Sequence, residues 1–327
     1  MGFWGMPGAV VVAAFAIAAL TALARPAIAQ DVVFDIPLDD GRSQRALFSS
    51  PANPTATLVM FAGGEGTVEI TDSGKIDGYL GNFLLRTQPL WLEQSFAVEV
   101  LAAPNNVSLV GERHTEAYAE AVGRAVDFAR SKVTAPIWLV GTSAGTIGAA
   151  NAASRLTGKI AGLVLTSSVT RSSVETVFDV DLAAIAVPVL IVANENDACP
   201  GTPPANAPRI AAALERSPRK EVIYVRSDQI RSPVCESFSP HGFLGVEADV
   251  AQRIGSWIRA TLAEYRVRLR IGSMAEPVQQ AASPGDMEME YVSGHSTSDR
   301  YLRGRRQQAA LSGCRQSPIE RLLCLRS

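Results

Sequence analysis

The sequence contains little of what several common kinds of site require. It has only three histidines and four cysteines among 327 residues, and they form no cluster with the spacing of a metal site. Its 30 lysines and arginines are balanced by 32 aspartates and glutamates, which gives a formal net charge of −2. Because nucleic-acid binding needs a clear basic excess, nucleic acid is not expected as a partner. Neither a metal nor another cofactor is predicted.

One long apolar run is present, at residues 9–24, and Ala27-Ile28-Ala29 follows it. This combination predicts a secretory signal peptide, residues 1–29, that is cleaved after Ala29. No lysine or arginine precedes the run, which is close to the length of a short spanning helix, so an uncleaved membrane anchor is the alternative. After cleavage, the chain is expected in the periplasm or outside the cell, without stable membrane association.

The rest of the chain has enough apolar material for a folded core, with 47% apolar and 19% charged residues overall. Continuous apolar strands and helical patterns alternate between residues 30 and 265. Strands are expected near residues 32–38, 45–50, 56–62, 97–103, 136–141, 161–167, 187–194 and 221–226, and helices near 115–133, 207–217 and 246–267. This alternation predicts a doubly wound α/β domain with a mostly parallel sheet.

The composition changes towards the C-terminus. Residues 266–301 are polar, contain proline, glycine and serine, and show little periodicity, so they predict a flexible linker. Residues 302–327 form a basic tail, in which Cys314 and Cys324 are close enough in sequence to be bonded. In an exported chain, disulfides are the expected state of an even number of cysteines.

The most informative stretch begins where the strand at residues 136–141 ends in Gly141-Thr-Ser-Ala-Gly145, followed by a row of small residues. A strand, the pattern G-x-S-x-G and a helix form a nucleophile elbow, which presents a serine at the top of the sheet. Glycines at 141 and 145 allow the strand and the helix to approach closely. Ser143 is therefore the predicted nucleophile, and the backbone N–H of Ala144 is a predicted oxyanion donor.

The alternative for this stretch is a glycine-rich loop that binds the phosphates of a dinucleotide. The spacing of Gly141, Gly145 and Gly148 differs from G-x-G-x-x-G, and the stretch does not follow the first strand. In addition, no tyrosine is followed four residues later by lysine, as a short-chain dehydrogenase would need. The elbow is therefore the favoured interpretation.

An acid and a base follow the elbow in the order that hydrolases use. Asp197 comes just after the strand at 187–194, and His241 lies between the strand at 221–226 and the last helix. Glu195 is the alternative for the acid. Four other residues are less suitable: two aspartates that precede the acid-bearing strand, and histidines in the linker and before a helix, namely Asp179, Asp181, His295 and His114.

With these residues the chain resembles the α/β-hydrolase superfamily over about residues 31–265. It is also similar to a subgroup of exported bacterial hydrolases with a Ser-Pro-His-Gly-Phe histidine loop, here residues 239–243. Haloalkane dehalogenases and epoxide hydrolases carry aspartate at the elbow, and dienelactone hydrolases carry cysteine. Serine at 143 therefore implies acyl transfer to water.

The resemblance also implies where the second oxyanion donor lies. Residues 61–67, FAGGEGT, stand where related enzymes carry His-Gly-x, although Gly63 replaces the histidine. The matching position is Glu65, whose backbone N–H is the expected donor, with that of Gly64 as the next candidate.

Two features describe the surroundings of the site. Residues 167–187 are about 20 in number, which allows one crossover helix but no separate cap domain. A bond between Cys199, two residues after Asp197, and Cys235, six before His241, would tie the acid loop to the base loop. Three apolar side chains, those of Phe83, Leu84 and Trp91, are expected in the core rather than on a substrate wall.

The sequence thus predicts a secreted, carboxylesterase-like serine hydrolase acting on a small-molecule ester through an acyl-enzyme. A peptidase or amidase with the same triad, or a non-catalytic binding protein on a hydrolase scaffold, are the alternatives. The acyl group, the alcohol and the oligomeric state are not indicated by the sequence.

Overall fold

The structure, a computed structural model, describes residues 28–274 and the first two residues of the chain. Most of the predicted signal peptide and the predicted pair Cys314–Cys324 lie outside the described residues, as does the predicted linker beyond Met274. No helix within the described part of the chain has both the length and the apolar character needed to cross a bilayer.

The centre of the fold is an eight-stranded sheet with the order β1-β2-β6-β3-β7-β8-β9-β10. Its strands are β1 (Ile28–Pro37), β2 (Ser43–Pro51), β3 (Ala56–Phe61), β6 (Phe96–Leu101), β7 (Ile137–Thr142), β8 (Gly162–Thr166), β9 (Val189–Asn194) and β10 (Lys220–Val225). The pairs β1–β2 and β2–β6 are antiparallel and all others are parallel. The predicted, mostly parallel sheet is confirmed.

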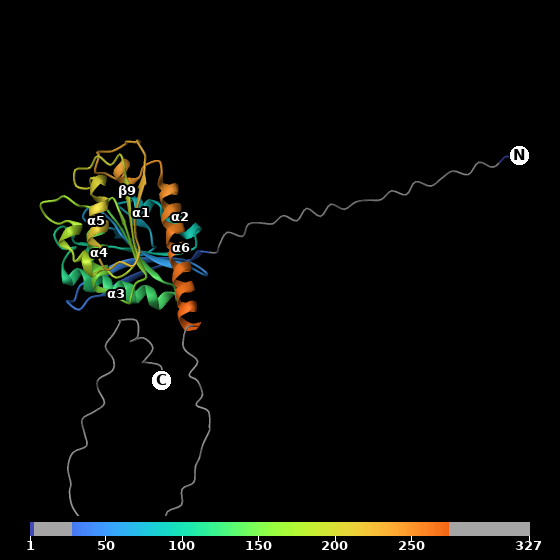
Figure 1. The fold of residues 1–327 in the computed structure, drawn as a ribbon, viewed down its shortest axis with the longest axis horizontal. Coiled ribbons are helices and arrows are strands. Elements are labelled where there is room, and N and C mark those ends of the chain that lie inside the picture. Colours follow the sequence, from blue (N-terminus) through green and yellow to red (C-terminus); the bar gives the residue numbers. More distant parts are fainter. Residues whose placement is uncertain (3–27, 275–327) are drawn as a thin grey trace, which may run out of the picture. The chain divides into compact units, whose positions relative to one another are not determined.

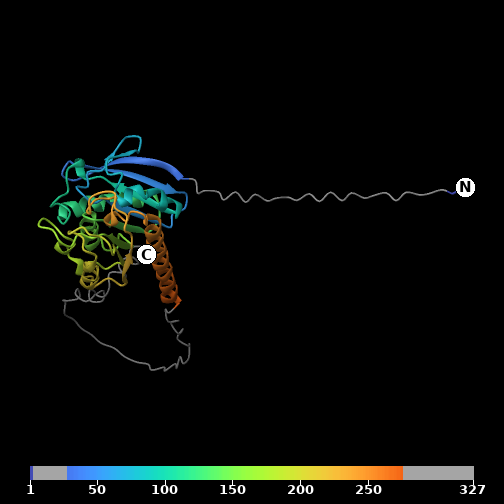
Figure 2. The same cartoon turned by 90° about the horizontal axis from the view of Figure 1, so that it is seen from above.

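Helices cover both faces of the sheet (Figure 1). One layer contains α3 (Glu116–Lys132), α4 (Gly145–Arg155) and α5 (Ala207–Ala213), and the other contains α1 (Phe83–Arg86), α2 (Gln88–Glu93) and α6 (Glu247–Met274). Every residue of the central strands β3, β6, β7, β8 and β9 is buried, because both of their faces pack against helices. In Figure 2 the antiparallel strands β1 and β2, in blue, lie at one edge of the domain.

The helix α3 shows how local sequence sets these elements. The side chain of Thr115 accepts a hydrogen bond from the N–H of Tyr118 and so caps the first turn. Glu116 lies in the first turn, and Arg130 and Lys132 lie in the last, as the helix dipole favours. Its buried face contains alanines and valines that pack on the sheet.

Three details differ from the sequence-based expectation. Between β8 and β9 the chain forms two 3₁₀ helices, Val177–Asp179 and Leu182–Ala184, instead of one crossover helix, because Thr176 with Asp179 caps the first and Asp181 caps the second. The last helix continues past its predicted end at Val267 to Met274, so residues 266–274 are helical where the linker was predicted to begin. A short hairpin, β4 (Glu69–Ile70) with β5 (Ile76–Asp77), was not predicted.

Other expectations hold. Within the described residues no separate cap domain is present. Phe83, Leu84 and Trp91 are all buried, so their predicted place in the core is confirmed.

Candidate active site

Ser143 occupies a sharp corner between β7 and α4. Its φ is +53°, in the left-handed region that non-glycine residues rarely adopt. Its N–H donates a hydrogen bond to the carbonyl of Thr166, at the end of the neighbouring strand β8. Strained backbone of this kind persists only where the surrounding structure fixes it, and it is common at functional sites.

Close packing of backbone on backbone fixes this corner. A Cβ atom on Gly145 would lie 2.7 Å from the Ala62 carbonyl oxygen and closer still to that of Phe61. Only glycine therefore allows the first turn of α4 to rest against the end of β3. The corner thus depends on a contact between two backbone segments.

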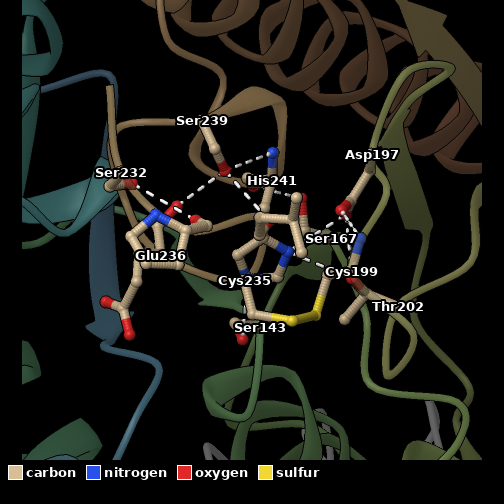
Figure 3. The surroundings of a disulfide bond; sticks show 12 residues. Ser143, Ser167, Asp197, Cys199, Thr202, Ser232, Cys235, Glu236, Ser239 and His241 are labelled. Carbon is tan, nitrogen blue, oxygen red and sulfur yellow. Dashed lines mark hydrogen bonds and ion pairs between the residues drawn. A yellow bond between two sulfur atoms is a disulfide. The ribbon is translucent and has the colours of Figure 1, made fainter. Parts of the chain in front are cut away.

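Ser143, His241 and Asp197 are brought together by three different loops (Figure 3). The Oγ of Ser143 is 3.0 Å from Nε2 of His241, and Nδ1 of the same imidazole is 3.0 Å from Oδ2 of Asp197. His241 and Asp197 are buried, and Ser143 is half-buried. This geometry allows a proton to pass from the serine hydroxyl to the imidazole while the carboxylate orients the ring.

Further hydrogen bonds hold the carboxylate of Asp197. Its Oδ1 accepts the N–H of Cys199 at 2.9 Å, and its Oδ2 accepts the hydroxyl of Thr202 at 2.8 Å. The Oγ1 of Thr202 is also 3.0 Å from Nδ1 of His241. Thr202 therefore lies at the junction of acid and base, and both carboxylate oxygens have protein donors.

The loop that carries His241 is held through its backbone carbonyls. Asn194, at the end of β9, donates from Nδ2 to the carbonyl of Pro240 at 2.9 Å. Ser167, which follows β8, donates its hydroxyl to the carbonyl of His241 at 2.7 Å. Residues at the ends of β8 and β9 thus fix the position of the His241 loop relative to Ser143.

Cys199 and Cys235 form a disulfide beside these residues (Figure 3). Cys199 belongs to the loop of Asp197, and Cys235 belongs to the loop that leads to His241. The bond therefore joins the acid loop to the base loop, as its position in the sequence suggested.

The loop after β3 approaches the serine closely. A Cβ atom on Gly63 would lie 2.8 Å from the Cβ of Ser143. The N–H of Glu65 donates to the hydroxyl of Tyr79 at 3.2 Å. Within residues 28–274, the N–H groups of Gly64 and Ala144 donate no hydrogen bond. Of the two amides expected in this loop, that of Gly64 is thus the one without an acceptor.

The alternative acids and bases have other partners. Glu195 is exposed and pairs with Arg226 at 3.0 Å, while Asp179 and Asp181 cap the two 3₁₀ helices. His114 lies 3.3 Å from Glu175 through Nδ1. His295 lies outside the described residues. Among the described residues no group of histidine, cysteine, aspartate and glutamate could hold a metal.

Sequence reasoning missed Thr202, Asn194 and Ser167. Each acts through a hydrogen bond to a residue far away in the chain or across a loop. None belongs to a motif with fixed spacing, so no signal in this sequence could have identified them.

Comparison with known proteins gives a structural result only. No protein-family model matches the sequence, and no curated protein is significantly similar to it. Est1E from Butyrivibrio proteoclasticus is 14% identical over 71% of this chain and 99% of its own, with a TM-score of 0.50. The esterase PF2001 from Pyrococcus furiosus is 9% identical over 71% and 91%, with a TM-score of 0.52. A fungal esterase from Rhizomucor miehei is 17% identical over 74% and 85%, with a TM-score of 0.51.

These similarities, together with the sheet order and the two helical layers, show that the chain has the α/β-hydrolase fold. The fold expected from the sequence is therefore confirmed.

Proposed function

We propose that the chain is an exported serine hydrolase that cleaves carboxylic esters through an acyl-enzyme. The observation that carries this proposal is the hydrogen-bonded series Asp197–His241–Ser143, with the serine in a left-handed conformation at the end of β7. A serine hydroxyl is a weak nucleophile unless a base takes its proton, and this series supplies that base.

In the proposed reaction, Nε2 of His241 accepts the proton of Ser143 as Oγ attacks the ester carbonyl. The carboxylate of Asp197 holds Nδ1–H and stabilises the imidazolium that forms. The imidazolium then gives its proton to the leaving alcohol. The imidazole then takes a proton from a water molecule that attacks the acyl-enzyme, and it returns this proton to Oγ of Ser143 as the carboxylic acid leaves.

The negative oxygen of the tetrahedral intermediate needs fixed donors. We assign this role to the N–H groups of Ala144 and Gly64. Ala144 follows Ser143 in the chain, Gly64 follows the glycine that packs on Ser143, and neither N–H has an acceptor within the described residues. Glu65, the donor first expected, is less suitable because its N–H is engaged by Tyr79.

Two observations favour an ester as substrate and an extracytoplasmic location. Besides Est1E, the similar structures include proteins that are named esterases, one of them a carboxyl esterase from Bacillus coagulans. The apolar run with its A-x-A site, together with a disulfide beside the triad, is what an exported chain would carry.

Replacement of the nucleophile tests the proposal. In Ser143→Ala, turnover of p-nitrophenyl acetate should fall to the uncatalysed rate, while the melting temperature stays close to that of the wild type. A panel of p-nitrophenyl esters of increasing chain length would then define the acyl group. Retained turnover in a pure Ser143→Ala sample would remove the central assignment.

A further inference from the structure

The carbonyl group of Gly64 is bound by a charged side chain. Nη2 of Arg113 donates to this oxygen at 2.6 Å. The guanidinium comes from the loop before α3, far from Gly64 in sequence, and Arg113 is only 1% exposed. A buried arginine needs partners for its charge and its donors, so its contacts indicate what holds it in place.

Arg113 is fixed on several sides. Nη1 donates to Oε1 of Glu175 at 3.3 Å, and the backbone N–H donates to the other oxygen of the same carboxylate at 3.2 Å. Nη1 also lies 3.3 Å from the carbonyl of Leu109. The backbone carbonyl of Arg113 accepts a bond from Asn151 at 3.0 Å, and Asn151 belongs to α4, the helix that begins after Ser143.

The peptide group between Gly64 and Glu65 is consequently held at both ends. Its carbonyl oxygen accepts from Arg113, and its N–H donates to the hydroxyl of Tyr79. In a trans peptide these two groups point in opposite directions, so the two contacts fix the orientation of the plane. Gly64 has a φ of +57°, and glycine has many other conformations available without such contacts.

We propose that Arg113 is a positioning residue for the oxyanion site. By holding the Gly64 carbonyl it fixes one side of the Gly64 Cα, and the close packing of Gly63 on Ser143 fixes the other, so that the Gly64 N–H in the peptide between them points at the oxygen that forms beside Ser143. This inference rests on the proposed function of that amide. Glu175 is the counter-ion that keeps the guanidinium in place, and Asn151 links the arginine to the nucleophile helix. Arg113 thus contacts the loop of Gly64 through its guanidinium and the helix α4 through its backbone carbonyl.

A positioning role can be separated from a structural one by removing the charges singly and together. Arg113→Met alone leaves the Glu175 carboxylate buried without its main partner, so this variant should lose stability. The double variant Arg113→Met/Glu175→Gln removes both charges and should recover most of the lost melting temperature. A purely structural arginine predicts that activity recovers with stability.

The positioning role predicts a different result. In both variants kcat for p-nitrophenyl acetate should fall by about 10- to 100-fold, and KM should stay within about twofold. This decrease is smaller than the one expected when a whole oxyanion donor is removed. The matched control is Arg219→Met, which removes an arginine that pairs with Glu264 on the α6 side of the fold. Its kcat should equal that of the wild type. A double variant with recovered stability and wild-type kcat would overturn the proposal.

A second measurement does not depend on turnover. In protein labelled with ¹⁵N-glycine, the amide signals of Gly64 and Gly66 should shift or broaden in the double variant, and distant glycines such as Gly158 should not change. If the wild type shows no turnover that depends on Ser143, the proposed function is wrong. The amide signals still test whether Arg113 holds the loop of Gly64 in place. Unchanged Gly64 and Gly66 signals would contradict it.

Discussion

The serine corner and the loops of Asp197 and His241 are built in different ways. At the corner, Ser143 is fixed by backbone packing, where Gly145 lets α4 rest on the end of β3. In the two loops, side chains make the connections: Thr202 donates to Asp197, and Asn194 donates to the carbonyl beside His241. A disulfide adds a covalent link between them.

This difference predicts how each region responds to a substitution. A carbon atom added at Gly145 overlaps backbone carbonyl groups. These groups cannot shift without moving the strand to which they belong, so a small change has a large effect. Side-chain hydrogen bonds can be removed one at a time, and each removal loosens the geometry by a limited amount. A Cβ added at Gly145 should therefore prevent folding, whereas removing single hydrogen bonds in the loops should lower activity by degrees.

The largest expected effect is at the corner. In Gly145→Ala the added Cβ overlaps the carbonyl groups of Phe61 and Ala62, and we expect no folded protein to accumulate. The control is Gly123→Ala in α3, where the added Cβ lies 3.4 Å from Leu156 and helix propensity should stabilise the fold by about 0.5–1 kcal/mol. Circular dichroism and expression yield check both. A folded, active Gly145→Ala protein would show that the corner has room.

The next effect concerns the disulfide between the loops. Replacing Cys199 and Cys235 by serine should lower the free energy of unfolding by about 3–4 kcal/mol through the entropy of the unfolded chain. Activity should fall earlier than the fold as reductant is added, because the N–H of Cys199 holds Asp197. Parallel titrations of turnover and near-ultraviolet circular dichroism compare the two. Full activity and stability in the double serine variant would contradict this role.

A smaller effect is expected at Thr202, where Thr202→Val keeps the shape and removes the hydroxyl. Without the donor to Asp197, kcat should fall by about tenfold, or about 1.4 kcal/mol, and the fold should lose about 1 kcal/mol. In Thr261→Val, a control in α6 that loses a bond to the carbonyl of Trp257, stability should fall similarly without a change in kcat. Equal kcat values in the two variants would show that the hydroxyl serves the fold alone.

The smallest effect at neutral pH is expected away from both regions, at Glu99 on β6. Both of its carboxylate oxygens lack a partner among residues 28–274, and burial raises its pKa well above the ordinary value. The folded chain therefore keeps this proton to higher pH than the unfolded chain does. Its contribution to stability is fully present below the unfolded pKa of about 4 and is lost as the pH rises through the folded pKa.

Melting temperatures across the pH range test this sign. In Glu99→Gln, which cannot ionise, the loss of stability at high pH should be smaller than in the wild type, and kcat should not change. Glu93→Gln, at an exposed position of α2, is the control and should keep the wild-type pH profile. An unaltered pH profile in Glu99→Gln would mean that the carboxyl finds a partner in solution.

The predictability of the fold and the site follows the same division. The eight strands were predicted because continuous apolar runs such as residues 56–62 have a clear pattern, and the corner was predicted because Gly141 to Gly145 are adjacent in sequence. The two 3₁₀ helices after β8 were not, because side-chain caps at Thr176 and Asp181 decide them. The extension of α6 to Met274 was also missed, because a polar helix end has no clear apolar stripe.

Within the site, sequence order indicated Ser143, Asp197 and His241, since hydrolases place these residues after particular strands. The sequence favoured Glu65 over Gly64 as the second oxyanion donor. The contact that makes Glu65 less suitable comes from the hydroxyl of Tyr79, which reaches the loop from a different segment. Contacts of this kind depend on the folded path of the chain and leave no spacing rule in the sequence.

The most direct test of the central claim is to find which residue a phosphonylating reagent modifies, and how fast it does so. We expect a fluorophosphonate to modify the folded protein once, at Ser143 in peptide mass spectra, and the rate to fall by more than about 100-fold in His241→Ala, whose base is gone. Modification at another residue, or equal rates in the wild type and His241→Ala, would contradict the claim that the imidazole activates this serine.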